Sequence, residues 1–176
     1  MIEFYDDRPP ASAEALAAAE RVLAEERQMI PPSYRAFLAE RDGGEPRQST
    51  FEFRERDVRD QRDLVQWFYS VEPSPGGSLA DTVMSLHGRL IPGMLPIACD
   101  PLGNQLLLDT RDGADGPIWW WDHERETTPP DESNLSWVAD DFPSFLAMLH
   151  ADEDEDDQPS VEPSRPGPLK RLFGRG

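Results

Sequence analysis

The sequence is short of cysteine, of positive charge and of long apolar runs. Its 176 residues include a single cysteine, Cys99, which cannot form an internal disulfide, and this usage favours a reducing compartment. No apolar run approaches the ~20 residues needed to cross a bilayer. The first residues, MIEFYDDRPP, are acidic and lack the basic and then apolar order of a signal peptide. We therefore expect a soluble, cytoplasmic protein that contacts no membrane.

Basic residues are outnumbered by acidic ones, with 17 Lys and Arg against 35 Asp and Glu and a formal net charge of −18. Residues 151–176 contain seven of the acids and four of the bases, so residues 1–150 retain a charge of −15. The acidity therefore belongs to the body of the protein. Such a body repels nucleic acid and attracts basic proteins. Solubility alone is the simpler explanation of the charge.

The length predicts one domain followed by a tail. We place the domain at residues 1–150 and the tail at residues 151–176. The tail begins with the acidic run DEDEDD and continues with four prolines, a composition that cannot bury a core, so we expect it to be disordered. LKRLF, at residues 169–173, is a candidate docking motif, although short basic and apolar clusters are common by chance.

Capping and periodicity signals predict four helices. They cover residues 12–27, a segment that starts at Pro31–Pro32, residues 78–89 and residues 141–150. Ser12, Ser78 and Asp141 are the expected N-caps, because their side chains can accept hydrogen bonds from the first free N–H groups of a helix. Gly43 and Gly44 are expected to end the second helix in the left-handed conformation.

Strand patterns lie in the second half of the chain. Three segments predict a three-stranded antiparallel meander. They are MLPIACD, QLLLD and PIWWWDHE, and the turn sequences PLGN and RDGADG separate them. Residues 50–53 also alternate as a strand does, whereas residues 57–69 leave helix and other structures open. The period of two divides the last strand between two faces. Ile118, Trp120 and Asp122 fall on one face, and Trp119, Trp121 and His123 fall on the other. We expect each tryptophan in the core rather than at an interface.

Catalytic and metal sites receive little support. Cys99 lies in the middle of a strand, where a small buried residue is expected, and no base is indicated within its reach. Oxygen ligands do cluster around the turns, but their spacing does not match an EF-hand, and turn formation explains the same residue types. They are Asp100, Asn104, Asp109, Asp112 and Asp115. Zinc spacing, a phosphate loop and a basic patch with aromatics are all missing, so we expect no catalytic residue, cofactor or metal.

Three segments in order resemble the SMI1/KNR4 family of the SUKH superfamily. IPPSYRAFLAERDGGEP resembles the family's LP-x-x-Y-x-x-FL helix that ends in NGG. LPIACDPLGNQLLLD resembles its P-(I/F)-A-x-D-x-x-GN hairpin, and GPIWWWDHE resembles its strand that ends near W-D-H-E. DDFPSFL matches the closing helix, so the resemblance spans about residues 12–150. The departures, DGG for NGG, Ile30 for Leu and Asp141 for Ser, are conservative.

The resemblance implies an α+β fold in which helices pack against a largely antiparallel sheet. It also implies binding rather than catalysis. Bacterial members resemble immunity proteins that neutralise toxin domains, often nucleases, and fungal members act as regulatory scaffolds. We therefore expect an immunity-type protein that binds a basic toxin domain, with a scaffold for other partners and an undetected hydrolase as alternatives.

Acids at the turns and ends of the sheet are the expected contact residues, because they can face a basic partner. They are Asp109, Asp112, Asp115, Asp122 and Glu124. For Asp109 and Asp122, burial as turn formers is an equally good interpretation.

Overall fold

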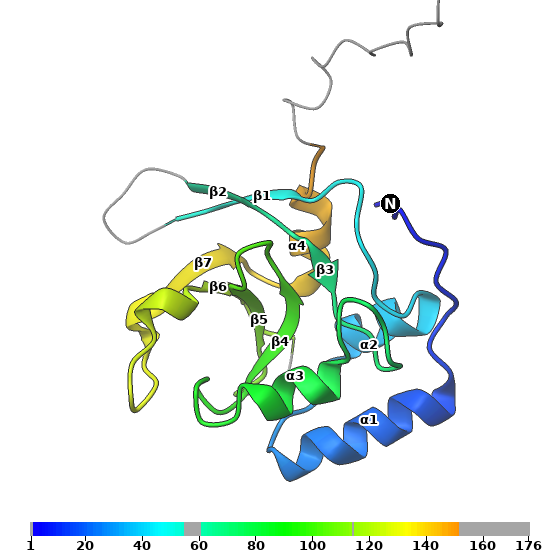
Figure 1. Ribbon diagram of the computed structural model, residues 1–176, viewed down its shortest axis with the longest axis horizontal. Helices are drawn as coiled ribbons and strands as arrows, with labels where there is room; N and C mark the ends of the chain where they lie inside the picture. The colour runs from blue at the N-terminus through cyan, green and yellow to red at the C-terminus, as the bar shows by residue number, and fades with distance from the viewer. Residues whose placement is uncertain (1, 55–60, 114, 152–176) are drawn as a thin grey trace, which may run out of the picture.

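The computed structural model describes residues 2–54, 61–113 and 115–151 (Figure 1). The predicted disorder of the tail concerns residues that, except for Ala151, lie outside this range. The helices are α1 (Ala13–Glu25), α2 (Pro32–Glu40), α3 (Leu79–Ser85) and α4 (Phe142–Met148), with the short 3-10 helices η1 (His123–Arg125) and η2 (Glu132–Asn134). The strands are β1 (Thr50–Phe53), β2 (Gln61–Leu64), β3 (Trp67–Phe68), β4 (Met94–Cys99), β5 (Gln105–Asp109), β6 (Ile118–Trp121) and β7 (Leu135–Ala139).

The strands form two antiparallel sheets. The larger has the order β3-β4-β5-β6-β7, so each strand pairs with its neighbour in sequence. The predicted three-stranded meander is its centre, β4 to β6. The smaller sheet pairs β1 with β2, and β1 continues beside β7 through a bridge between Arg54 and Trp137. The fold is therefore α+β, as the resemblance implies (Figure 1).

The predicted helices are present and start where the capping residues placed them. Ser12 accepts a hydrogen bond from Ala15 N–H at 3.1 Å, and Asp141 accepts one from Ser144 N–H at 2.7 Å. Ser78 caps α3 in the same way. Among the described residues, no helix is both long and apolar enough to cross a bilayer.

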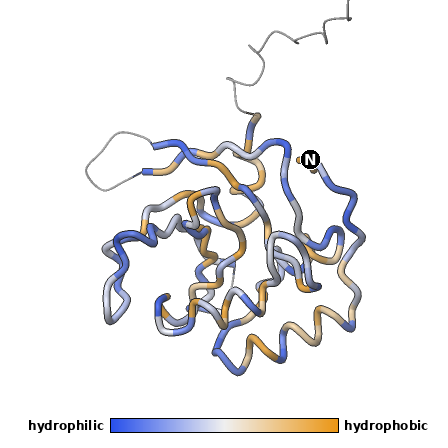
Figure 2. The backbone as a smooth tube through the Cα atoms, in the orientation of Figure 1, coloured by the Kyte–Doolittle hydropathy of each residue, from blue (hydrophilic) through white to orange (hydrophobic). Residues whose placement is uncertain are grey.

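Two apolar clusters lie on opposite faces of the larger sheet. The main core packs the inner faces of α1, α2, α3 and α4 against one face, with Tyr34 and Phe145 fully buried. The second cluster joins Trp121 to the segment after α3. Figure 2 shows apolar colour along the central strands. As predicted, Trp120 packs against the main core, and Trp119 and Trp121 belong to the other face.

Two local details differ from the expectations, and a third concerns a segment that the sequence left open. The described part of residues 57–69 is extended, since it contains β2 and β3. β7 was not expected as a strand. The second helix ends before the glycines: Arg41 leaves α2 with an extended backbone, and Gly43, with φ of 67°, makes the following turn. There an added Cβ would lie only 2.5 Å from the Phe68 carbonyl oxygen, so Gly43 allows close packing against β3 instead of capping α2.

Candidate binding surface

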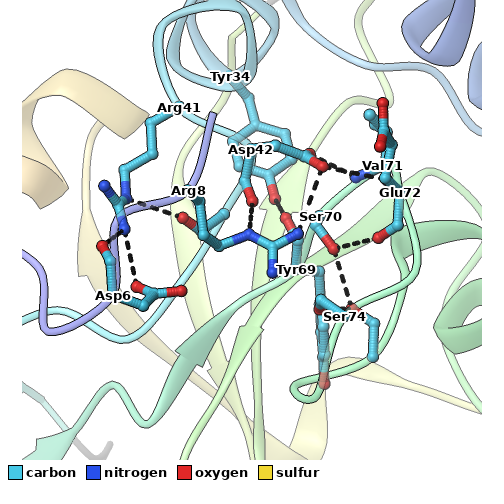
Figure 3. A network of polar contacts seen from close by, with 12 residues as sticks. Asp6, Arg8, Tyr34, Arg41, Asp42, Tyr69, Ser70, Val71, Glu72 and Ser74 are labelled. Atoms are coloured by element: carbon cyan, nitrogen blue, oxygen red, sulfur yellow. Dashed lines mark hydrogen bonds and ion pairs between the residues drawn. The ribbon is translucent and has the colours of Figure 1, made fainter. Parts of the chain in front are cut away.

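The first family-like segment forms a buried polar network (Figure 3). The Tyr34 hydroxyl lies 2.9 Å from the carbonyl oxygen of Tyr69 and 3.2 Å from that of Ile97, and it donates to these acceptors. Complete burial, together with the nearby Asp42 carboxylate, raises the pKa of Tyr34 well above its ordinary value. The phenol therefore keeps its proton and joins α2 to the strand residues that follow it.

Asp42 is the centre of the same network. Its carboxylate accepts hydrogen bonds from the N–H groups of Val71 and Glu72, at 2.7 and 3.2 Å, and lies 3.6 Å from the Arg8 guanidinium. The residue is only 2% exposed, so these partners replace the water it loses on burial. This aspartate, which stands where the family has asparagine, has a structural role.

The second and third family-like segments meet at one end of β6. The Asp100 carboxylate accepts hydrogen bonds from Leu102 N–H and from the backbone and side-chain N–H groups of Asn104, at 2.6 to 2.8 Å. The Asn104 side-chain oxygen then accepts from His123 N–H at 3.1 Å. These contacts confirm the turn-forming roles of Asp100 and Asn104, and they explain why the two segments occur together.

Asp100 also contacts Asp63 of β2, a pairing that the sequence did not indicate. Burial raises the pKa of Asp63 to about 7, and a hydrogen bond from its carboxyl to Asp100 adds to the effect. Burial alone would raise the pKa of Asp100, but the donors around it, Asp63 first, hold it below its usual value. Trp120 Nε1–H donates to Asp63 at 3.0 Å. The two carboxyl groups therefore share a proton and connect the two sheets.

This pair does not form an evident hydrolytic site. Neither Asp63 nor Asp100 lines any of four cavities found among the described residues. Within the same part of the chain, no group of three or more His, Cys, Asp and Glu side chains could hold a metal ion. Burial raises the pKa of the Cys99 thiol, the opposite of what activates a cysteine nucleophile.

Three of the five expected contact acids make contacts within the domain. Burial raises the pKa of Asp109, but hydrogen bonds from Arg111 outweigh it and lower the pKa below its usual value. The Asp109–Arg111 ion pair measures 2.6 Å. Asp115 accepts from Ser33 N–H and O–H, at 3.1 and 2.6 Å, in the first turn of α2. Asp122 accepts from Glu124 N–H at 2.9 Å and caps η1.

Asp112 and Glu124 are the exposed members of the set. Asp112 lies in the turn after β5, and Glu124 lies in residues 122–134, which we call the cover loop. The loop connects β6 with β7 and lies at the left of Figure 1. Its Glu132 binds Arg111 at 2.9 Å. Arg111 therefore holds the loop beside Asp109 and brings part of the set together.

The cover loop adds acids that the sequence analysis did not single out. Glu126, Asp131 and Glu132 are exposed, and Figure 2 shows the loop as largely hydrophilic. Glu126 binds Arg89 at 2.9 Å, and Arg89 lies over the Trp121 ring. The loop thus presents carboxylates outward while its contacts cover the second apolar cluster. Acidic density in the segment DHERETTPPDESN was the signal that could have identified it.

Comparison with known protein families matches residues 10–148 to the SMI1 / KNR4 family (SUKH-1). The chain belongs to this family. The match extends from the turn before α1 to the end of α4, so it includes both sheets and the cover loop. A search of curated proteins finds no match. In this chain the family-like side chains make hydrogen bonds that hold the fold together, as seen for Tyr34, Asp100, Asn104 and His123. The exposed acids are therefore the candidate contact groups.

Proposed function

We propose that this SUKH-1 protein is a non-catalytic, immunity-type binding protein that neutralises a basic toxin domain, such as a nuclease. The exposed acidic cover loop is the observation that carries the proposal. Nuclease surfaces are basic because they hold phosphate, and carboxylates in fixed positions can occupy such a surface. The five turn acids remain the proposed contact residues, and the cover-loop acids extend the surface that they form.

The contacts around the loop support this function. Arg111 and Arg89 tie Glu132 and Glu126 to the sheet, so part of the loop is ordered before a partner binds. A preordered surface loses less conformational entropy on binding than a free one. The excess of acid over base in the body would also speed the approach of a basic partner at low ionic strength.

Affinity capture from the protein's own cells, with washes at low and high salt, tests the function. We expect mass spectrometry to identify one basic, toxin-like protein whose retention falls with salt. Retention of signalling or cell-envelope proteins would instead favour the scaffold alternative. The charge reversals Asp112→Lys and Glu124→Lys together should slow association with the captured toxin at least tenfold, because they replace attraction with repulsion.

The matched control reverses Glu45 and Glu72, which are also exposed but lie in the segments beside β3, at the other edge of the larger sheet. Both double variants change the net charge equally. An equal loss of association in the two would show that overall charge, and not the proposed surface, determines binding.

A further inference from the structure

A groove of about 530 Å³ lies between the end of α1, the segment after α3 and the cover loop. Its walls are mostly apolar. They include Val83, Leu86, Leu90, Pro92, Pro129 and Pro130. Charged and titratable side chains line its rim: Glu25, Glu26 and Arg27 from the end of α1, and His87, whose Nδ1 lies 2.5 Å from the Glu26 carboxylate. An apolar groove bordered by carboxylates suits a segment that alternates apolar and cationic side chains.

Gln28 contributes a polar side chain to the wall of the groove. It lines the groove, and its side-chain N–H donates to the Met94 carbonyl oxygen at 3.1 Å. Its side-chain oxygen is buried and has no hydrogen-bond partner among the described residues.

The chain itself contains a segment of the matching composition. After Glu162 the sequence has four basic residues and no acidic one, and LKRLF, residues 169–173, places two adjacent cations among three large apolar residues. This composition is opposite in charge to the body. The groove beside α4 is a poorer match, because Arg41 and Arg47 balance its two acids, Glu3 and Glu40, whereas the first groove has two glutamates and one arginine.

We propose that residues 169–173 of the same chain bind in the groove between α1, α3 and the cover loop. The apolar side chains of the segment fill the proline-lined part, and Lys170 and Arg171 face Glu25 and Glu26. The proposal does not depend on the toxin partner. If that partner exists, the segment competes with it at the neighbouring cover loop.

Chain length permits the contact. Residues 152–168 form a spacer of 17 residues, which spans about 58 Å when fully extended and about 23 Å on average as a flexible coil. A domain of this size has a radius of gyration of about 15 Å. The chain leaves the domain beside α4, at the end opposite the groove (Figure 1), so the spacer must extend beyond its average coil length, and the effective concentration lies below the ~1 mM of a short flexible linker.

Competition with a free peptide tests the proposal on the full chain. The probe is a synthetic peptide of residues 164–176, titrated into ¹⁵N-labelled protein and followed by amide chemical shifts. The variant K170E/R171E should bind the peptide with its largest shifts at residues 25–28 and 83–90. The native chain should bind it at least tenfold more weakly, because its own segment occupies the groove.

The matched control, R165E/R175E, changes the net charge by the same amount but leaves LKRLF intact, so it should behave as the native chain does. Equal peptide affinity in the native chain and K170E/R171E would overturn the proposal, as would shifts centred on another groove. If the weaker peptide binding of the native chain disappears when the protein is diluted, the segment binds a second copy of the chain, and the proposal is overturned as well. The variant L172S/F173S, which leaves the charge unchanged, should bind the peptide as tightly as K170E/R171E does, because its own segment no longer occupies the groove.

Discussion

The shared proton of Asp63 and Asp100 should make the stability of this protein depend on pH. Burial raises the pKa of Asp63 from 3.8 to about 7. The folded state therefore binds a proton that the unfolded state releases near pH 4. The stability contributed by this proton is complete below pH 4 and is lost as the pH rises through 7. Asp100, whose pKa is lowered, opposes this trend at the acidic end.

The size of the effect follows from the shift. About three pKa units correspond to an upper limit of about 4 kcal/mol. Asp63 is only half-buried, and water screens part of the interaction, so we expect about 1–2 kcal/mol. The variant Asp63→Asn keeps a permanent donor toward Asp100 and an acceptor for Trp120. It should unfold with an almost constant free energy in this pH range and should exceed the native stability at pH 8.

Urea unfolding between pH 4.5 and pH 8 measures the difference, with Asp112→Asn as a control at an exposed position. The curves of the native protein and Asp63→Asn should diverge as the pH rises, and the curve of Asp112→Asn should run parallel to the native one. Parallel curves for all three proteins would refute the shared proton. A gap that widens toward acid would show that the sign is wrong.

Three further changes test the buried network by denaturant unfolding. Tyr34→Phe should cost about 1–3 kcal/mol, because the carbonyl groups that face the hydroxyl lose their donor; a neutral result would contradict this role. Asp42→Ala should cost about 3 kcal/mol or more, because two buried N–H groups lose their acceptor and Arg8 loses its carboxylate partner while keeping its bond to the carbonyl oxygen of residue 42, whereas Asp42→Asn should cost less than half of that. Gly43→Ala should cost at least 2 kcal/mol more than Gly113→Ala, since both have positive φ but only Gly43 lacks room for a Cβ; equal costs would rule out the close contact.

Features set by neighbouring residues in sequence could be predicted. Ser12, Ser78 and Asp141 identified helix starts because a cap needs only the next three residues. Asp100 and Asn104 identified a turn for the same reason. The alternation of the tryptophans gave the two faces of β6 because it depends only on strand period.

Features that depend on distant partners could not be predicted. β3 has only two residues and exists through pairing with β4. In β7, LSWVA, the polar Ser136 is buried and the apolar Trp137 is exposed, so residue type does not reveal the faces of the strand, which is defined by its pairing with β6. The burial of Asp63 follows from the approach of Trp120 and Asp100, which lie far from it in sequence. The cover loop likewise depends on Arg89 and Arg111 from other segments.

The acids of this protein divide into two groups, and the division decides which variants can report on binding. Asp42 and Asp100 are buried, and Asp109, Asp115 and Asp122 hold turns or helix starts. Replacing any of these changes local structure, so a loss of binding would not identify a contact. Substitutions at Asp112, Glu124, Glu126 and Glu132 remove charge without removing such a hydrogen bond to the backbone, whereas Asp131 caps η2 by accepting from Ser133 N–H at 2.8 Å and belongs with the structural acids. A partner should therefore be located first with that exposed group, and with the structural acids only after their stability is known.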